Sequence, residues 1–172
     1  MDLFVSIVRR LSQLCGIVSA LTLAAAVLVV CQMVVLRYLL NESTVWQTEF
    51  TTYSLVGATL IGSPYVLLRR GHVNVDLLPL YLPHRARLVL AFVASFLALA
   101  FCGVLAYSGA ELWLDAWLGG WTTDSIWRLP LWIAYAPIPV GVGLLCLQYV
   151  ADILCLATGR AMPFGLEPGD QP

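Results

Sequence analysis

Side chains that could carry chemistry are few in this 172-residue chain. The two histidines, His72 and His84, lie in one connection between apolar stretches, so they are not spaced to hold a haem iron from two facing helices. Glu111 and Asp115 lie four residues apart on one helical face, where they could bind a cation, although a solvated rim is the simpler interpretation. The five cysteines contain no Cys-x-x-Cys pair, which argues against a zinc site or a disulfide framework. We therefore expect no enzyme activity, no cofactor and no metal.

Four windows without a charged residue divide the chain, at residues 11–36, 50–68, 88–110 and 129–151. A helix rises about 1.5 Å per residue, so about 20 residues cross a hydrocarbon core of about 30 Å. With 60% hydrophobic and only 11% charged residues, the chain has too little polar surface for an ordinary soluble globule. Backbone amides in lipid must be satisfied within the chain, and the windows are too long for barrel strands. The sequence therefore predicts an integral membrane protein with only α-helices.

The expected architecture is a single bundle of four transmembrane helices within residues 1–160, followed by a flexible cytoplasmic tail at 161–172. The helices are predicted at about 11–36, 46–68, 84–114 and 129–157. No connection between windows is long enough for a second domain.

The positions of the arginines predict the orientation, because positively charged loops stay in the cytoplasm. The formal charge consists of nine arginines and ten acids, with no lysine. Seven arginines flank one side of the windows and two flank the other: Arg9, Arg10, Arg69, Arg70, Arg85, Arg87 and Arg160 against Arg37 and Arg128. Both termini are therefore expected in the cytoplasm. The six tryptophans fall near the outer ends of the windows, where an indole suits the headgroup layer: Trp46, Trp113, Trp117, Trp121, Trp127 and Trp132.

The connection between the second and third windows, residues 69–87, is too apolar for a plain loop. Arginines close both ends, and apolar residues alternate with Asn74 and Asp76. Such a segment can lie in the cytoplasmic headgroup layer with its apolar side toward the lipid. Pro79 and Pro83 limit it to a short helix or turn.

Polar and small residues inside the windows favour helix packing over chemistry. Gln32 is the deepest strongly polar side chain, and we expect it to form an interhelical hydrogen bond. Small residues recur every four positions on three helices: Gly16, Ala20, Ala24; Ser54, Ala58, Gly62; and Ala94, Ala98, Cys102, Ala106, Ala110. These stripes can serve contacts within the chain or a face offered to another membrane protein. Pro137 and Pro139 predict a kink in the fourth helix.

Three stretches resemble the small permease subunit of the tripartite ATP-independent periplasmic (TRAP) transporters, and the resemblance covers nearly the whole chain. The first is Trp46 to Glu49, which opens the second helix. The second is the segment RRGHVNVD at 69–76, which closes that helix and is the most specific of the three. The third is LPLW at 129–132, continuing through Pro137, Pro139 and Gly141. Their order and spacing agree with the four-helix topology of that family.

The resemblance implies a scaffold beside a much larger, 12-helix permease subunit that binds substrate and sodium ions and imports an organic acid. A soluble periplasmic binding protein delivers the substrate. The chain is then expected in the bacterial inner membrane, with these two proteins and membrane lipids as partners and without nucleic acid. A stand-alone membrane anchor or assembly factor for another complex is the alternative, because it would show the same hydropathy.

The resemblance also implies roles for individual residues. Trp46 and Glu49 match the outer end of the second helix and would anchor it, with Glu49 able to pair with the large subunit. Four residues match the inner-end motif and would hold the interfacial segment against headgroups or the partner: Arg69, Arg70, His72 and Asp76. On the outer face, an acidic surface could steer a binding protein with basic patches. Its candidate residues are Glu111, Asp115 and Asp124.

Overall fold

The computed structural model describes residues 2–69 and 84–158, and these residues are predominantly helical. The helices are α1 (Asp2–Leu39), α2 (Val45–Leu68), α4 (His84–Leu118), α5 (Leu131–Tyr135) and α6 (Pro137–Ala157). Within the described part, the β-type pairing is one isolated bridge between Thr122 and Pro130. The interfacial segment expected between the second and third predicted helices and the expected tail lie outside the described residues, apart from Arg69 and the start of α4.

Three stretches of helix are long and apolar enough to cross a membrane: Leu3–Leu39, Leu88–Leu118 and Leu131–Ala157. The helix α2 has 24 residues and is about 36 Å long, so its length suffices for a fourth crossing. It is not among these three stretches, and threonine and serine recur along it. The membrane character predicted from the sequence is thus carried by three spans, and a crossing by α2 remains a proposal.

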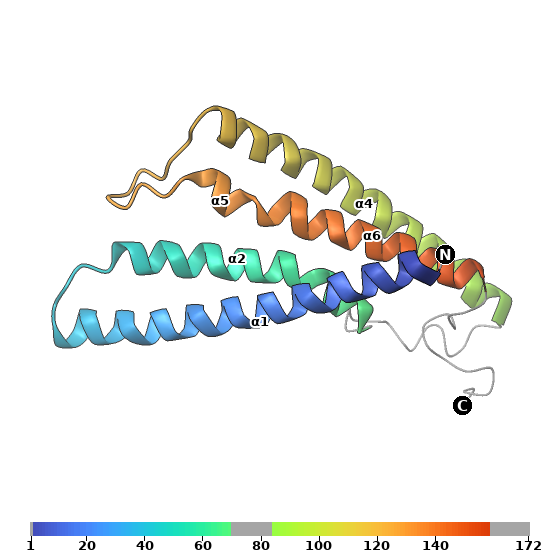
Figure 1. Ribbon diagram of the computed structural model, residues 1–172, viewed down its shortest axis with the longest axis horizontal. Helices are drawn as coiled ribbons and strands as arrows, with labels where there is room; N and C mark the ends of the chain where they lie inside the picture. Colours follow the sequence, from blue (N-terminus) through green and yellow to red (C-terminus); the bar gives the residue numbers. More distant parts are fainter. Residues whose placement is uncertain (1, 70–83, 159–172) are drawn as a thin grey trace.

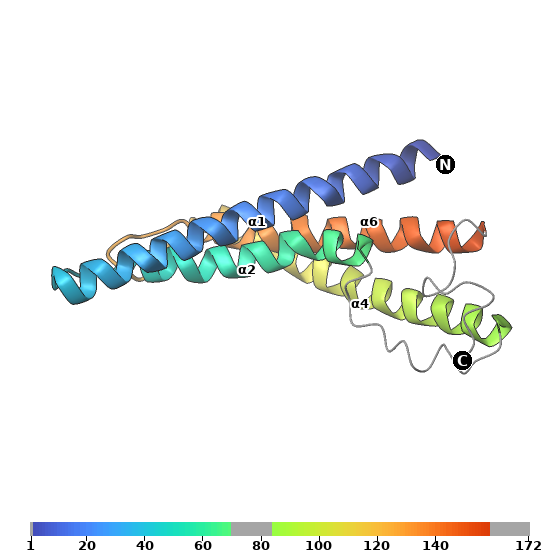
Figure 2. The ribbon, with the colours of Figure 1, turned by 90° about the horizontal axis from the view of Figure 1, so that it is seen from below.

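The helices form two antiparallel hairpins that lie side by side (Figure 1). The helix α1 packs along α2, α4 packs along α6, and the contact of α2 with α6 joins the two pairs. The helix α4 contacts α5 and α6 and has at most marginal contact with α1 and α2 among the described residues. The predicted bundle is therefore an open layer in the order α1, α2, α6, α4, and the view in Figure 2 shows α1 and α4 at its edges. Such a layer leaves broad apolar surface that no other described residue covers.

A glycine on α6 and a proline on α2 mark the close contact between these helices. Pro64 has no backbone N–H, so the carbonyl of Leu60 lacks its usual helical donor. The hydroxyl of Ser63 donates to that carbonyl at 2.8 Å. Gly141 of α6 lies against the backbone of Leu60 and Ile61, where any Cβ would collide. The two helices therefore meet backbone to backbone.

Small residues also join α1 to α2. The Ser19 hydroxyl donates to the Ala58 carbonyl at 2.7 Å, and a Cβ on Gly62 would lie 2.7 Å from that hydroxyl oxygen. The Tyr65 ring fills the space that a side chain at Gly16 would need. Parts of two predicted stripes thus serve contacts within the chain. Other members of the stripes are exposed, namely Ala20, Ala24 and Ala94.

The fourth predicted helix is broken at Ala136, between α5 and α6. The break coincides with Pro137 and Pro139, which cannot donate backbone hydrogen bonds. The amide of Ala136 still donates to the Trp132 carbonyl at 3.1 Å, so the two pieces stay nearly continuous. The interruption lies where these prolines predicted a kink.

Candidate functional site

The loop between α4 and α5 folds back onto the start of α2 (Figure 1). The hydroxyl of Thr123 donates to the Glu49 carboxylate at 3.3 Å and accepts from the Leu129 amide at 3.0 Å. The rings of Trp46 and Trp127 lie 6.3 Å apart at 58°. Two of the residues singled out in the sequence, Trp46 and Glu49, are thus brought together as an anchor for this loop. The partner that Glu49 contacts in the structure is in the same chain.

Three tryptophans tie the end of α4 to α5. The Trp113 indole donates to the Trp132 carbonyl at 3.0 Å. The Trp117 ring lies 4.7 Å from the Trp132 ring in an edge-to-face arrangement and 5.6 Å from the Trp113 ring. Indoles in such a cluster expose an apolar body and a polar edge, as the headgroup layer favours.

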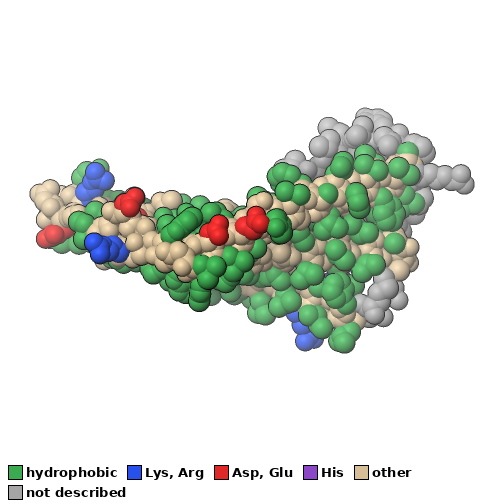
Figure 3. Space-filling view, turned by 90° about the horizontal axis from the view of Figure 1, so that it is seen from above, with side chains coloured by type: hydrophobic (Ala, Val, Ile, Leu, Met, Phe, Trp, Pro, Cys, Tyr) green, Lys and Arg blue, Asp and Glu red, His purple; other side chains and the backbone are tan. Residues whose placement is uncertain are grey.

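The candidate acidic residues are exposed at the same end of the molecule. Glu111 and Asp115 lie one turn apart on α4, and Asp124 lies in the loop after it. The Glu111 carboxylate accepts a hydrogen bond from the Tyr107 hydroxyl. In Figure 3 acidic side chains gather on the half of the molecule that carries this loop. The arrangement fits a charged rim open to a partner.

At the opposite end, Arg69 caps α2. Its Nε donates to the Tyr65 hydroxyl at 3.1 Å, and its guanidinium lies 5.5 Å from the centre of that ring. Because Tyr65 packs on Gly16, Arg69 is held against the α1–α2 pair. The other three residues of the inner-end motif lie outside the described residues: Arg70, His72 and Asp76.

A buried polar chain joins α1 to α6, and the sequence reasoning missed it. The Ser12 hydroxyl donates to Gln148 Oε1 at 2.9 Å, and Gln148 Nε2 donates to Asp152 Oδ1 at 3.0 Å. Ser12 and Gln148 are only 2% and 3% exposed. Gln32, the expected interhelical residue, is exposed, so that prediction was wrong. The spacing of Gln148 and Asp152, four apart, was the available signal.

Two more polar groups are buried near the outer end of α2. Gln47 is 2% exposed, yet its Oε1 has no hydrogen-bond partner among the described residues. The hydroxyl of Thr51, one turn along, is also buried without a partner there. Both groups are neutral, so they cost less in a membrane than a charge would.

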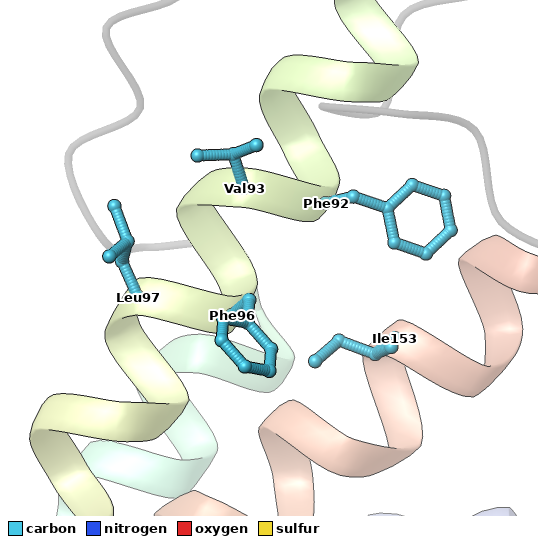
Figure 4. A pocket seen from close by; sticks show the side chains of 5 residues that line it. All are labelled: Phe92, Val93, Phe96, Leu97 and Ile153. Carbon is cyan, nitrogen blue, oxygen red and sulfur yellow. The ribbon is translucent and has the colours of Figure 1, made fainter.

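An open hollow of about 370 Å³ lies between α4 and α6 (Figure 4). It is lined by apolar side chains, namely Phe92, Val93, Phe96, Leu97 and Ile153. Such a lining suits a lipid chain or an apolar side chain and carries no group for catalysis.

Within residues 2–69 and 84–158, no three His, Cys, Asp or Glu side chains come together as a metal site would require. The five cysteines are free thiols. Cys102 is buried in the small core with Val142 and Leu145, whereas Cys31 is exposed. The arrangement of the described residues is therefore one of packing surfaces and anchors.

Comparison with known proteins agrees with this picture. Residues 26–159 match the family described as tripartite ATP-independent periplasmic transporters, DctQ component. The chain is similar to the C4-dicarboxylate TRAP transporter small permease protein DctQ of Vibrio cholerae, with 28% identity over 148 residues, 74% of this chain and 64% of that protein. It is also similar to the protein of the same name from Rhodobacter capsulatus, with 26% identity over 69% of this chain and 52% of that protein.

The match therefore spans less than two thirds of the length of each of these curated relatives. No solved structure matches the chain. The family match covers more than half of the residues and includes the contacts of Trp46 and Glu49 with the loop after α4, the α2–α6 contact and the break at Ala136. The chain belongs to the DctQ family, the small permease component of the TRAP transporters.

Proposed function

We propose that the chain is a non-catalytic scaffold subunit of a TRAP-type secondary transporter. It pairs in the membrane with a large 12-helix permease subunit, and a periplasmic binding protein delivers the substrate. The family match over residues 26–159 is the observation that carries this proposal. Two relatives named as C4-dicarboxylate TRAP transporter components support uptake of an organic acid as the process it serves, and the sodium drive rests on the sequence resemblance.

The open helix layer supports a role exerted through surfaces. The described buried polar side chains, Ser12, Gln47 and Gln148, are all neutral. A substrate or ion path through a membrane protein usually contains charged or strongly polar groups around a cavity. Here Ser12 and Gln148 instead join α1 to α6, while large apolar side chains cover the outward faces of α1 and α4. These features suit a fixed part that supports a moving neighbour.

We further propose four crossings of the bacterial inner membrane with both termini in the cytoplasm. The uneven distribution of arginines supports this orientation. The tryptophan pairs mark one membrane boundary, because Trp46 with Trp127 and Trp117 with Trp132 lie at the end opposite Arg69. The helix α2 is long enough to cross the membrane. The helices α1 and α6 cover two of its sides, which leaves less of α2 to face lipid.

Residue roles follow from this placement. Trp46 and Glu49 hold the loop between α4 and α5 on α2. This placement keeps Asp124 of the loop beside Glu111 and Asp115 of α4, and the three form a surface for the binding protein. Arg69 anchors the inner end of α2. Three further residues would hold the cytoplasmic segment at the headgroups or the permease: Arg70, His72 and Asp76. Their roles rest on the sequence resemblance.

Co-purification tests the proposal. A tagged chain is expressed with the large permease and the binding protein encoded by neighbouring genes, extracted in mild detergent and captured by its tag. We expect the large permease in near-equal amount. An unrelated small membrane protein with the same tag is the control. Recovery of a different membrane complex, without the permease, would favour the alternative role as an anchor or assembly factor.

A further inference from the structure

The loop between α4 and α5 is a short hairpin with an apolar tip. We call residues 121–131 the outer hairpin. Two backbone hydrogen bonds join its arms: Leu131 N to Trp121 O at 2.9 Å, and Thr123 N to Leu129 O at 3.0 Å. The chain reverses in a β-turn, which is closed by the bond from the Arg128 amide to the Ser125 carbonyl at 3.2 Å. Ile126 and Trp127 therefore occupy the two central positions of the turn.

Side chains fix the shape of the outer hairpin and its position on α2. The Ser125 hydroxyl accepts a hydrogen bond from the Trp127 amide at 3.2 Å and lies 3.2 Å from the Thr123 hydroxyl. Thr123 in turn donates to Glu49, and the Trp127 ring packs beside Trp46. Because the hairpin is already ordered in the chain alone, a partner that binds its tip does not have to immobilise it first.

The residues at the tip are not the ones that a turn favours. Ile126 is 92% exposed, the highest value among the large hydrophobic side chains of the described residues. Central turn positions favour proline, glycine, asparagine, aspartate and serine. Arg128 has a φ of 46°, a conformation that favours glycine or asparagine. A single exposed apolar residue is ordinary on a surface, but three successive residues unsuited to their turn indicate selection for a contact.

The place and charge of the tip favour a soluble protein as its partner. The loop extends past the ends of α4 and α5, away from the helix faces where a membrane neighbour packs (Figure 1). Apolar tips that enter a lipid surface are usually accompanied by basic residues. Here the turn is flanked by exposed Asp124 as well as Arg128, and Glu111 and Asp115 are exposed at the same end. Three acids beside one arginine would be repelled by anionic lipid.

Tightly packed apolar anchors surrounded by polar groups carry much of the free energy of protein association. We propose, on the basis of the scaffold role above, that Ile126 is the apolar anchor of a docking site for the periplasmic binding protein. The matching surface on the binding protein is an apolar pocket with basic groups at its rim, which face Asp124 and the acids of α4. The acidic residues then steer the binding protein, and Ile126 holds it once it has arrived.

Uptake by the reconstituted transporter tests the anchor. Ile126→Asn removes the apolar side chain and supplies a residue that suits a turn, so the chain should fold, which thermal unfolding verifies. We expect the binding-protein concentration for half-maximal uptake to rise about tenfold, with an unchanged rate at saturation. Leu118→Asn is the matched control, because Leu118 is 81% exposed at the end of α4 but lies outside the outer hairpin. An unchanged concentration dependence in Ile126→Asn, or an equal shift in the control, overturns the proposal.

Salt separates an apolar anchor from charge steering. Ions screen charges and leave the burial of an apolar side chain largely intact. The effect of Ile126→Asn should therefore persist at high salt. An effect that disappears as salt is raised would show that Ile126 acts through the neighbouring charges and would overturn the anchor.

Photo-crosslinking identifies the partner directly. A photo-crosslinking amino acid replaces Ile126 or, in the control, Leu118, and the full transporter is illuminated during uptake. We expect the binding protein to be captured from position 126 and not from position 118. Capture of only lipid or the permease from position 126, or no capture from a complex that transports, contradicts the proposal.

The outcomes also distinguish this proposal from the function on which it rests. A complex that co-purifies and transports, but in which Ile126→Asn behaves as the unmodified chain, refutes the anchor and leaves the scaffold role standing. Failure of the unmodified chain to co-purify with the permease refutes the scaffold role itself.

Discussion

Removing the hydrogen bond between α1 and α6 should weaken the fold by an amount that the geometry bounds. The Ser12 hydroxyl donates to Gln148 Oε1 across 136 positions of sequence, at 2.9 Å, in a buried setting. Ser12→Ala leaves Gln148 Oε1 without this donor. Gln148→Leu removes the bond to Ser12 and also the bond to Asp152. The double variant completes a thermodynamic cycle that isolates the Ser12–Gln148 term.

The coupling energy between Ser12 and Gln148 can be estimated in two ways. An orphaned buried polar group in a soluble protein costs about 1–3 kcal/mol. Interhelical hydrogen bonds in membranes average about 0.6 kcal/mol and reach about 1.7 kcal/mol, because the unfolded chain in the membrane also finds partners. The second value applies here, since Ser12 can turn to its own helix when Gln148 is absent. High burial at both ends puts the expected coupling in the upper part of that range, near 1 kcal/mol.

The assay is denaturant-induced unfolding of the four purified chains in detergent micelles, followed by circular dichroism. Thr22→Ala is the control, because the Thr22 hydroxyl bonds only to the carbonyl of Val18 on its own helix. We expect the control to change the free energy of unfolding by less than about 0.5 kcal/mol. A coupling energy below about 0.3 kcal/mol, within the error of additivity, would refute the view that this bond joins α1 to α6.

Three further perturbations follow from the contacts. Gly141→Ala should lower the free energy of unfolding by about 1–3 kcal/mol, because the added Cβ meets the Leu60 backbone. Gly143→Ala is the control and should not change it, because the space around Gly143 is open. Equal effects of the two variants in thermal unfolding would contradict the α2–α6 contact. Thr51→Val should raise the free energy of unfolding by about 1 kcal/mol, because it removes a buried hydroxyl that has no partner among the described residues. Thr59→Val is the exposed control. A loss of stability in Thr51→Val would show that the Thr51 hydroxyl has a partner. Charge reversal at the three acidic candidates, Glu111, Asp115 and Asp124, should slow uptake most at low salt, because salt screens the attraction that steers the binding protein. Unchanged transport at all salt concentrations would exclude docking of the binding protein by these residues.

The charge pattern predicted where helices lie better than it predicted where they end. The helix α2 ends at Leu68, where the uncharged window ends. By contrast, α1 begins at Asp2 and passes through Arg9 and Arg10, and α4 continues through Glu111 and Asp115 to Leu118. A charged residue is expensive inside lipid but is compatible with a helix outside it, so a helix need not end where an uncharged window ends.

The sequence could not predict which side of a helix each polar residue faces. Gln32 lies deep in its window and is exposed, whereas Gln148 is buried against Ser12. Position along a helix gives depth in the membrane, but the partner depends on how two helices are rotated against each other. The partner of Glu49 could not be predicted either, because its hydrogen bond to Thr123 requires the loop between α4 and α5 to fold back onto α2. The proline signals were more informative, because loss of an N–H acts within its own helix at Ala136.

The measurement that bears most directly on the scaffold role is uptake into liposomes that contain the large permease. The substrate is an organic acid that the binding protein binds, with binding protein outside and an inward sodium gradient. Vesicles are prepared with and without this chain at equal permease content. The scaffold role predicts sodium-dependent uptake only when the chain is present, with no uptake by the chain alone. Uptake of equal rate without the chain, or uptake by the chain alone, would contradict it.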